Sequence, residues 1–122
     1  MKTCNYIHSI ELVTNSTTIN VYYRDDTDNS DYMLIDKANL EPEILSFEEM
    51  IFSKVEGSPI NICYANEDIS STNQRVSYIF DSEEGMSVIY KNIPVDFTGE
   101  EILQIRDFST LIKNYITVKI NE

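Results

Sequence analysis

The stretch RDDTDNSDY, residues 24–32, holds four aspartates in nine positions and so could bind a metal ion. A helix-flanked calcium loop needs oxygen ligands at alternating positions, a glycine at the sixth position and a glutamate at the twelfth. Counted from Asp26, the sixth position is Asp31 and the twelfth is Lys37. A cation stands where a bidentate carboxylate is required, so we expect no metal site. Strand-forming residues on both sides predict a hairpin turn instead.

The other residues that could carry chemistry are scattered along the chain. His8 is the only histidine, and alternation places it on the apolar face of an expected first strand. Cys4 and Cys63 form no CxxC or His/Cys cluster for zinc. We expect both cysteines to be small, buried hydrophobic residues, although they could approach each other if their strands pair. The three glycines are isolated, so no phosphate loop or dinucleotide fingerprint of the usual form is present. We therefore expect no catalytic residue, no cofactor and no enzyme activity.

Charge is the strongest compositional signal. The chain has 21 acidic and 9 basic residues, a formal net charge of −12. Direct binding to nucleic acid needs clustered Lys and Arg, and an anionic membrane surface repels such a chain, so we expect neither partner. Two interpretations remain. The acidity keeps the protein in solution, or it directs the surface to a basic protein partner.

The expected location is the cytoplasm of a bacterium or of a phage-infected host. No apolar run reaches the ~18 residues that a membrane span needs. The first 13 residues lack the sustained apolar core of a secretory signal. Two unpaired cysteines fit a reducing compartment.

Hydrophobic periodicity predicts the elements of a single domain, residues 1–122. Apolar residues at spacings of three and four predict two amphipathic helices, over 41–57 and 97–115. Thr98 and Glu101 stand at capping-box spacing at the start of the second helix. Alternating patterns predict strands over 3–13, 18–23, 31–35, 59–65, 75–80, 86–91 and 116–120.

This order of elements predicts the α+β class, with a mainly antiparallel sheet of six to seven strands covered by two helices. It also suggests an internal repeat. Residues 19–64 and residues 75–120 are each predicted to contain a strand, an acidic hairpin turn, a strand, a helix and a strand, in that order. This order predicts a duplicated ββαβ unit after one N-terminal strand. The tripeptide EIL at 43–45 recurs at 101–103, an offset of 101 − 43 = 58.

The tyrosines beside the acidic turns are candidate binding residues. The chain has eight tyrosines and no tryptophan. Tyrosine packs well in strands, which is one interpretation. The other is that tyrosine anchors surrounded by carboxylates bind a basic protein. The predicted partner-binding residues are Asp25, Asp26, Asp28, Asp31, Glu83, Glu84, Tyr22 and Tyr32.

Two functional hypotheses follow. The first is a non-enzymatic acidic inhibitor of a basic, nucleic-acid-handling protein, of the immunity or phage anti-defence (anti-CRISPR) type. It would act by occlusion, with carboxylates mimicking the phosphates of nucleic acid. The second is a protein that binds or sequesters a small ligand such as a nucleotide, as a homo-oligomer with its pocket between subunits. The phosphate ligands would then be Arg24, Arg75 and Arg106.

Overall fold

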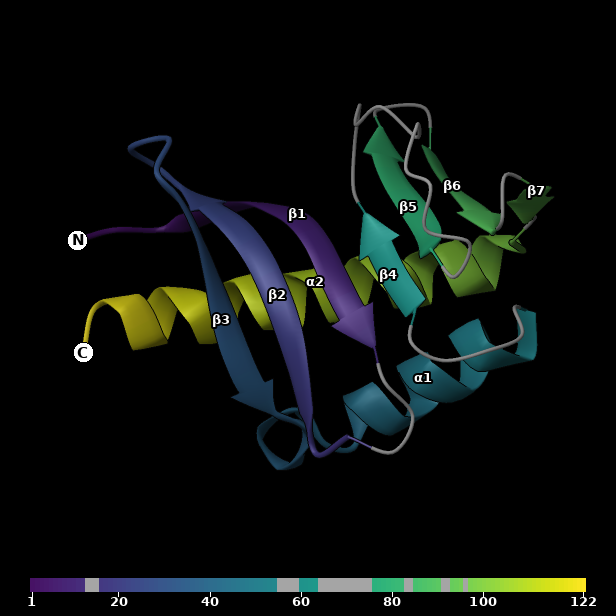
Figure 1. Cartoon of the computed structure of the whole chain (residues 1–122), viewed down its shortest axis with the longest axis horizontal. Coiled ribbons are helices and arrows are strands. Elements are labelled where there is room, and N and C mark those ends of the chain that lie inside the picture. Colours follow the sequence, from purple (N-terminus) through teal and green to yellow (C-terminus); the bar gives the residue numbers. More distant parts are fainter. Residues whose placement is uncertain (13–15, 55–59, 64–75, 83–84, 91–92, 96) are drawn as a thin grey trace.

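The computed structural model describes residues 1–12, 16–54, 60–63, 76–82, 85–90, 93–95 and 97–122 (Figure 1). The helices are α1 (Glu43–Lys54) and α2 (Gly99–Ile120), with a short 3-10 turn, η1 (Lys37–Leu40), before α1. The strands are β1 (Cys4–Leu12), β2 (Thr18–Asp25), β3 (Ser30–Asp36), β4 (Ile60–Cys63), β5 (Val76–Ser82), β6 (Gly85–Tyr90) and β7 (Ile93–Val95).

The helices pack on an antiparallel sheet of three strands, in the order β3-β2-β1. The β2–β3 pairing runs from Thr18 opposite Asp36 to Arg24 opposite Ser30. Helix α2 passes beneath all three strands (Figure 1). On the far side of β1 the backbone pairing continues through β4, β5, β6 and β7, and the β4–β5 pair is parallel.

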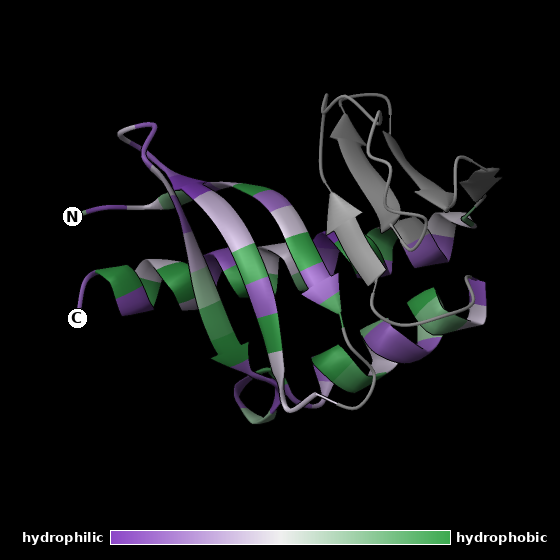
Figure 2. Cartoon of the chain, viewed as in Figure 1, coloured by the Kyte–Doolittle hydropathy of each residue, from purple (hydrophilic) through white to green (hydrophobic). Residues whose placement is uncertain are grey.

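The core lies between the three strands and the two helices. Apolar residues alternate with polar ones along β2, so one face of the strand is hydrophobic (Figure 2). The stripe of α2 at Ile105, Phe108, Ile112 and Ile116 is buried, as its spacing of three and four predicts. Phe108 stacks on Phe47 of α1, with ring centroids 4.1 Å apart. Burying one such large apolar side chain contributes about 1.5–3 kcal/mol.

Two ion pairs tie the helices in place. Lys37 Nζ lies 3.0 Å from Glu48 Oε2 and joins η1 to α1. Lys54 Nζ lies 2.8 Å from Glu101 Oε1, so the end of α1 meets the start of α2. Thr98 and Glu101 form the predicted capping box, which satisfies backbone amides at the start of α2.

The predicted sheet is wrong, although the α+β class is confirmed. We expected a mainly antiparallel sheet of six to seven strands from a duplicated ββαβ unit. The structure instead packs two helices on the three-stranded antiparallel sheet β1–β3, and the strands that pair beyond β1 are joined through the parallel β4–β5 pair. Residues 116–120, the predicted last strand, form the last turn of α2. The second half of the chain therefore reads β5, β6, β7, α2 and does not repeat the first.

Contacts distant in sequence explain why residues 116–120 are helical. Their β-branched side chains favour a strand, but helix and strand propensities are weak and packing overrides them. The Cys4 N–H donates to Thr117 Oγ1 at 3.0 Å. At the helix end, Asn121 Nδ2 donates to the carbonyl oxygen of Lys2, and the Lys2 N–H donates to Asn121 Oδ1. These bonds join the helical end of the chain to β1.

Among the described residues, no helix is both long and apolar enough to cross a bilayer.

Candidate functional site

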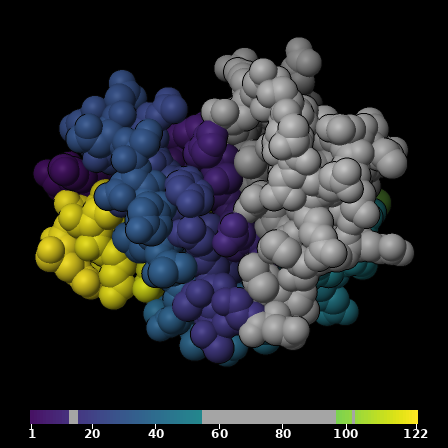
Figure 3. All heavy atoms as spheres, viewed as in Figure 1, coloured from purple at the N-terminus to yellow at the C-terminus, as the bar shows by residue number. Residues whose placement is uncertain are grey.

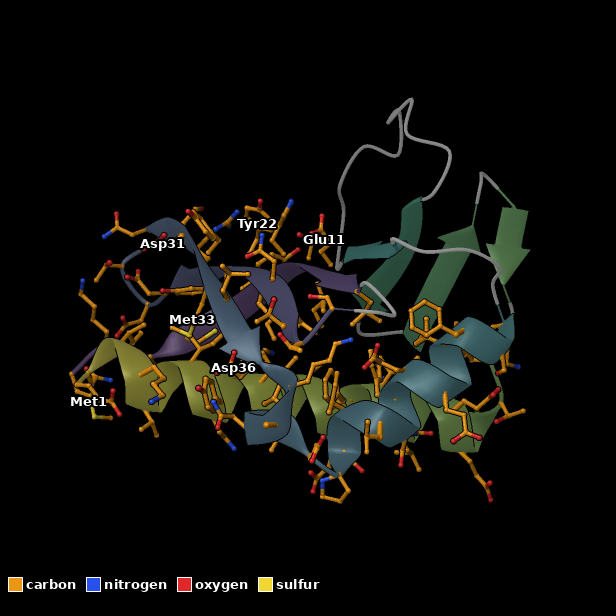
Figure 4. The ribbon with its side chains drawn as sticks, turned by 60° about the horizontal axis from the view of Figure 1, so that its bottom comes forward. Met1, Glu11, Tyr22, Asp31, Met33 and Asp36 are labelled. Atoms are coloured by element: carbon orange, nitrogen blue, oxygen red, sulfur yellow. The ribbon has the colours of Figure 1, made fainter. Side chains whose placement is uncertain are left out.

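The outer face of the sheet, opposite α2, carries exposed aromatic side chains. Figure 4 shows Tyr22 on the side of the sheet away from the helices, and Met33 between sheet and helix. We call this surface the tyrosine face. Its residues are Tyr6, His8, Tyr22, Arg24 and Tyr32, and Asp31 follows at the hairpin edge of the face. In the space-filling view the atoms of β2 and β3 form a continuous surface on this side (Figure 3).

Tyr22 and Tyr32 form a cross-strand pair at the centre of the tyrosine face. They stand directly opposite each other in the β2–β3 register. Their ring centroids are 5.7 Å apart, with the rings tilted by 39°. Tyr22 is 43% exposed and Tyr32 is 58% exposed. The pair is therefore held in place by the hairpin while about half of its surface remains exposed for contact.

A hollow of about 410 Å³ lies on this face. Tyr22, Tyr32 and His8 line it, together with Tyr23, Arg24, Ser30 and Asp31. The guanidinium carbon of Arg24 lies 5.3 Å from the ring centroid of Tyr6, a cation–π contact that holds the arginine against the sheet. The hollow thus offers aromatic surface, one guanidinium and one carboxylate.

His8 faces this hollow, and its predicted place on the apolar face is wrong. Strand β1 has irregularities in its register between Cys4 and Tyr6 and between Ile7 and Ser9. Each irregularity shifts the alternation, so Ile7 and Ile10 are both buried while His8 lines the outer hollow. The sequence does contain one sign of this irregularity. Strict alternation would have left the apolar side chain of Ile7 outside the core.

Asp25 closes the hairpin turn and is 6% exposed. Its Oδ1 accepts hydrogen bonds from the hydroxyl of Thr27 at 2.6 Å, from the Thr27 N–H at 2.8 Å and from the Asn29 N–H at 3.1 Å. The Thr27 hydroxyl in particular, with these two amides, holds the pKa of Asp25 below its ordinary value. Asp28 adopts the left-handed conformation that the turn requires, with φ of 61°. The structure thus gives Asp25 a role in the turn.

The remaining predicted aspartates, Asp26, Asp28 and Asp31, are exposed on or beside the turn. The carboxylate of Asp31 accepts the backbone N–H of Tyr32 at 2.8 Å, which fixes a negative charge beside the backbone at the start of β3. Within the part of the chain that the structure describes, no three His, Cys, Asp or Glu residues are grouped so that they could hold a metal ion.

The other predicted site residues are not brought to this face. Glu83, Glu84 and Arg75 lie outside the described residues. Arg106 is exposed on α2, which covers the opposite face of the sheet from Arg24, so these two arginines do not share a pocket. Cys4 is buried as a free thiol, and burial raises its pKa.

No protein-family model matches the chain, and no curated protein or solved structure shows significant similarity to it.

Proposed function

We propose that the protein is a non-enzymatic binding protein whose tyrosine face contacts a basic, nucleic-acid-handling protein and inhibits it. The observation that carries the proposal is the exposed Tyr22–Tyr32 pair, which the β2–β3 register fixes next to the acidic hairpin turn. Tyrosine is enriched among the residues that dominate protein interfaces, because its ring buries a large area with few rotatable bonds.

Charge gives this surface its selectivity for a basic partner. Asp26, Asp28 and Asp31 surround the hairpin end of the tyrosine face, and the chain as a whole carries −12. Carboxylates at these positions steer a cationic partner into contact and raise the association rate. In the complex they would occupy positions at which the partner otherwise binds phosphates, so that nucleic acid is excluded by occlusion.

A site-specific photo-crosslinker tests the proposal. A benzophenone-bearing phenylalanine replaces Tyr32, and in a matched control it replaces Leu45, an exposed residue of α1 away from the tyrosine face. Irradiation in a lysate of the organism that makes the protein should give a discrete adduct from position 32 only. Mass spectrometry should identify a basic protein that binds nucleic acid. The proposal would be rejected if both positions crosslinked to the same proteins, or if the protein crosslinked at position 32 were acidic.

The hollow on the tyrosine face supports a second candidate function, the binding of a small phosphorylated ligand such as a nucleotide. Arg24 lines the hollow, and guanidinium groups bind phosphate with paired hydrogen bonds. The rings of Tyr22 and Tyr32 would stack on a base.

A thermal-shift screen with nucleotides separates the two candidates. A ligand at about one hundred times its dissociation constant stabilises the folded state by about 2.7 kcal/mol, which is readily measured. The rise in melting temperature should be lost in Arg24→Ala and kept in Arg106→Ala. If no nucleotide at millimolar concentration raises the melting temperature, this second candidate fails and the first is unaffected.

A further inference from the structure

A second concave surface lies between the helices, on the other side of the molecule from the tyrosine face. Helix α1 packs against the first half of α2, with Phe47 stacked on Phe108 beneath the seam and the Lys54–Glu101 ion pair at one end. Along the seam is a groove of about 360 Å³. We call it the interhelical groove.

The interhelical groove has an apolar floor and an acidic rim. Pro42 and Leu103 are its exposed apolar residues, with Leu103 58% exposed, and Phe108 is buried beneath them. Glu43, Glu100 and Asp107 supply its charge, and no lysine or arginine is among the described residues that line it. A single exposed leucine is ordinary on a protein surface. Here it lies in a hollow bordered by three carboxylates, which is the pattern of a site for a ligand that is both apolar and cationic.

The charge of the protein decides which occupant fits. A second copy of the chain would bring its own net charge of −12 against these carboxylates, and repulsion would oppose a dimer through this groove. An anionic lipid surface would be repelled in the same way. A segment of another protein that carries lysine or arginine around a bulky apolar side chain satisfies both the floor and the rim.

We propose that the interhelical groove binds a basic amphipathic segment of a protein partner, with an apolar side chain of that segment seated against Pro42 and Leu103. Its cationic side chains pair with Glu43, Glu100 and Asp107. The inference is independent of the tyrosine face, because α2 covers the opposite side of the sheet. The two surfaces can therefore be occupied at the same time.

The probe for this site is a fluorescein-labelled synthetic peptide of about 15 residues, with leucines at helical spacing of three and four and lysines at the other positions. Fluorescence anisotropy measures its affinity for the full chain. We expect saturable binding that weakens at least about tenfold in Leu103→Glu, because a central apolar anchor contact is lost. The matched control is Leu45→Glu, which adds the same charge to an exposed leucine outside the groove and should bind within about twofold of the unchanged protein.

The rim is tested separately. The double variant Glu43→Gln, Asp107→Asn should bind the peptide more weakly than the double variant Glu49→Gln, Asp36→Asn, which removes the same charge from exposed positions outside the groove. Circular dichroism checks that each variant keeps its helices. Binding of the peptide should leave the NMR signals of Tyr22 and Tyr32 unchanged, so that failure of this site is distinguishable from failure of the tyrosine face.

Three results would overturn the inference. If Leu103→Glu and Leu45→Glu weakened peptide binding equally, the peptide would be responding only to the net charge of the protein. The absence of saturable binding up to about 1 mM peptide would mean that the groove has no useful affinity. A dimer in sedimentation experiments that dissociates in Leu103→Glu would mean that a second copy of the chain fills the groove.

Discussion

At the scale of single residues, the four aspartates of the opening stretch have different tasks. Asp25 is held inside the turn by three hydrogen bonds, while Asp26, Asp28 and Asp31 stay exposed. The turn of this acidic hairpin therefore depends on one carboxylate that accepts backbone and side-chain donors, and the other three are available for a partner. A charge-reversal experiment that included Asp25 would confuse loss of binding with loss of the turn.

Asp25 should stabilise the fold in a pH-dependent way. Because its pKa is lowered in the folded state, the ionised form is the stabilising one. The contribution should be fully present above the ordinary aspartate pKa of about 3.9 and should be lost as pH falls through the lower folded pKa. Asp25→Ala should therefore lower the melting temperature at pH 7, and the loss should shrink toward pH 2. Asp36→Ala, at an exposed aspartate whose side chain makes no cap hydrogen bond, is the control and should have a smaller effect. A pH-independent loss in Asp25→Ala would contradict the assigned role.

At the scale of elements, the last turn of α2 distinguishes the structure from the strand that the sequence predicts. In a strand, Ile116 and Val118 would share one face and have similar burial. In the structure Ile116 is fully buried and Val118 is 63% exposed. The helix thus continues the apolar stripe of Ile105, Phe108 and Ile112 by one more turn.

Alanine substitutions measure this difference directly. Ile116→Ala should cost about 2–5 kcal/mol of unfolding free energy, because it removes a buried side chain. Val118→Ala should cost less than about 1 kcal/mol, because an exposed side chain loses little contact. Urea denaturation followed by circular dichroism gives both values. Similar large costs at both positions would show that the segment is a strand after all.

The sequence predicts the elements whose determinants are local. The capping box at Thr98 and Glu101, the apolar stripe of α2 and the turn after Arg24 all follow from residues within a few positions of one another. The helical end of the chain cannot be predicted from nearby residues, because it depends on hydrogen bonds between Lys2 or Cys4 and residues more than 100 positions away.

The candidate site shows the same division between local and distant determinants. The Tyr22–Tyr32 pairing follows from the position of the hairpin turn. The presence of His8 in the hollow depends on the register irregularities of β1, which no alternation rule contains.

At the scale of the whole molecule, the net charge of −12 acts together with two separated surfaces. The tyrosine face lies on one side of the sheet and the interhelical groove on the other. Under the proposed function, long-range attraction would bring a cationic partner to the protein, and the aromatic or apolar anchors would set its dissociation rate.

Charge reversal at the hairpin should slow association with the crosslinked partner. In Asp28→Lys, Asp31→Lys the association rate should fall, and the difference from the unchanged protein should shrink above about 0.15 M salt, where charges more than about 8 Å apart are screened. The control, Asp36→Lys, Glu49→Lys, makes the same change in net charge at the other end of β3 and on α1, away from the hairpin turn. Stopped-flow kinetics gives the rates. Equal slowing in both double variants would mean that net charge alone steers the partner.

Displacement of nucleic acid tests the central claim most directly. The partner identified by crosslinking is loaded with a fluorescent oligonucleotide, and the protein is titrated into the complex. The account predicts full displacement by the unchanged protein. The folded double variant Tyr22→Ala, Tyr32→Ala should need at least about tenfold more protein, because loss of anchor side chains speeds dissociation. Simultaneous binding of protein and oligonucleotide to the partner, or equal displacement by the double variant, would contradict the account.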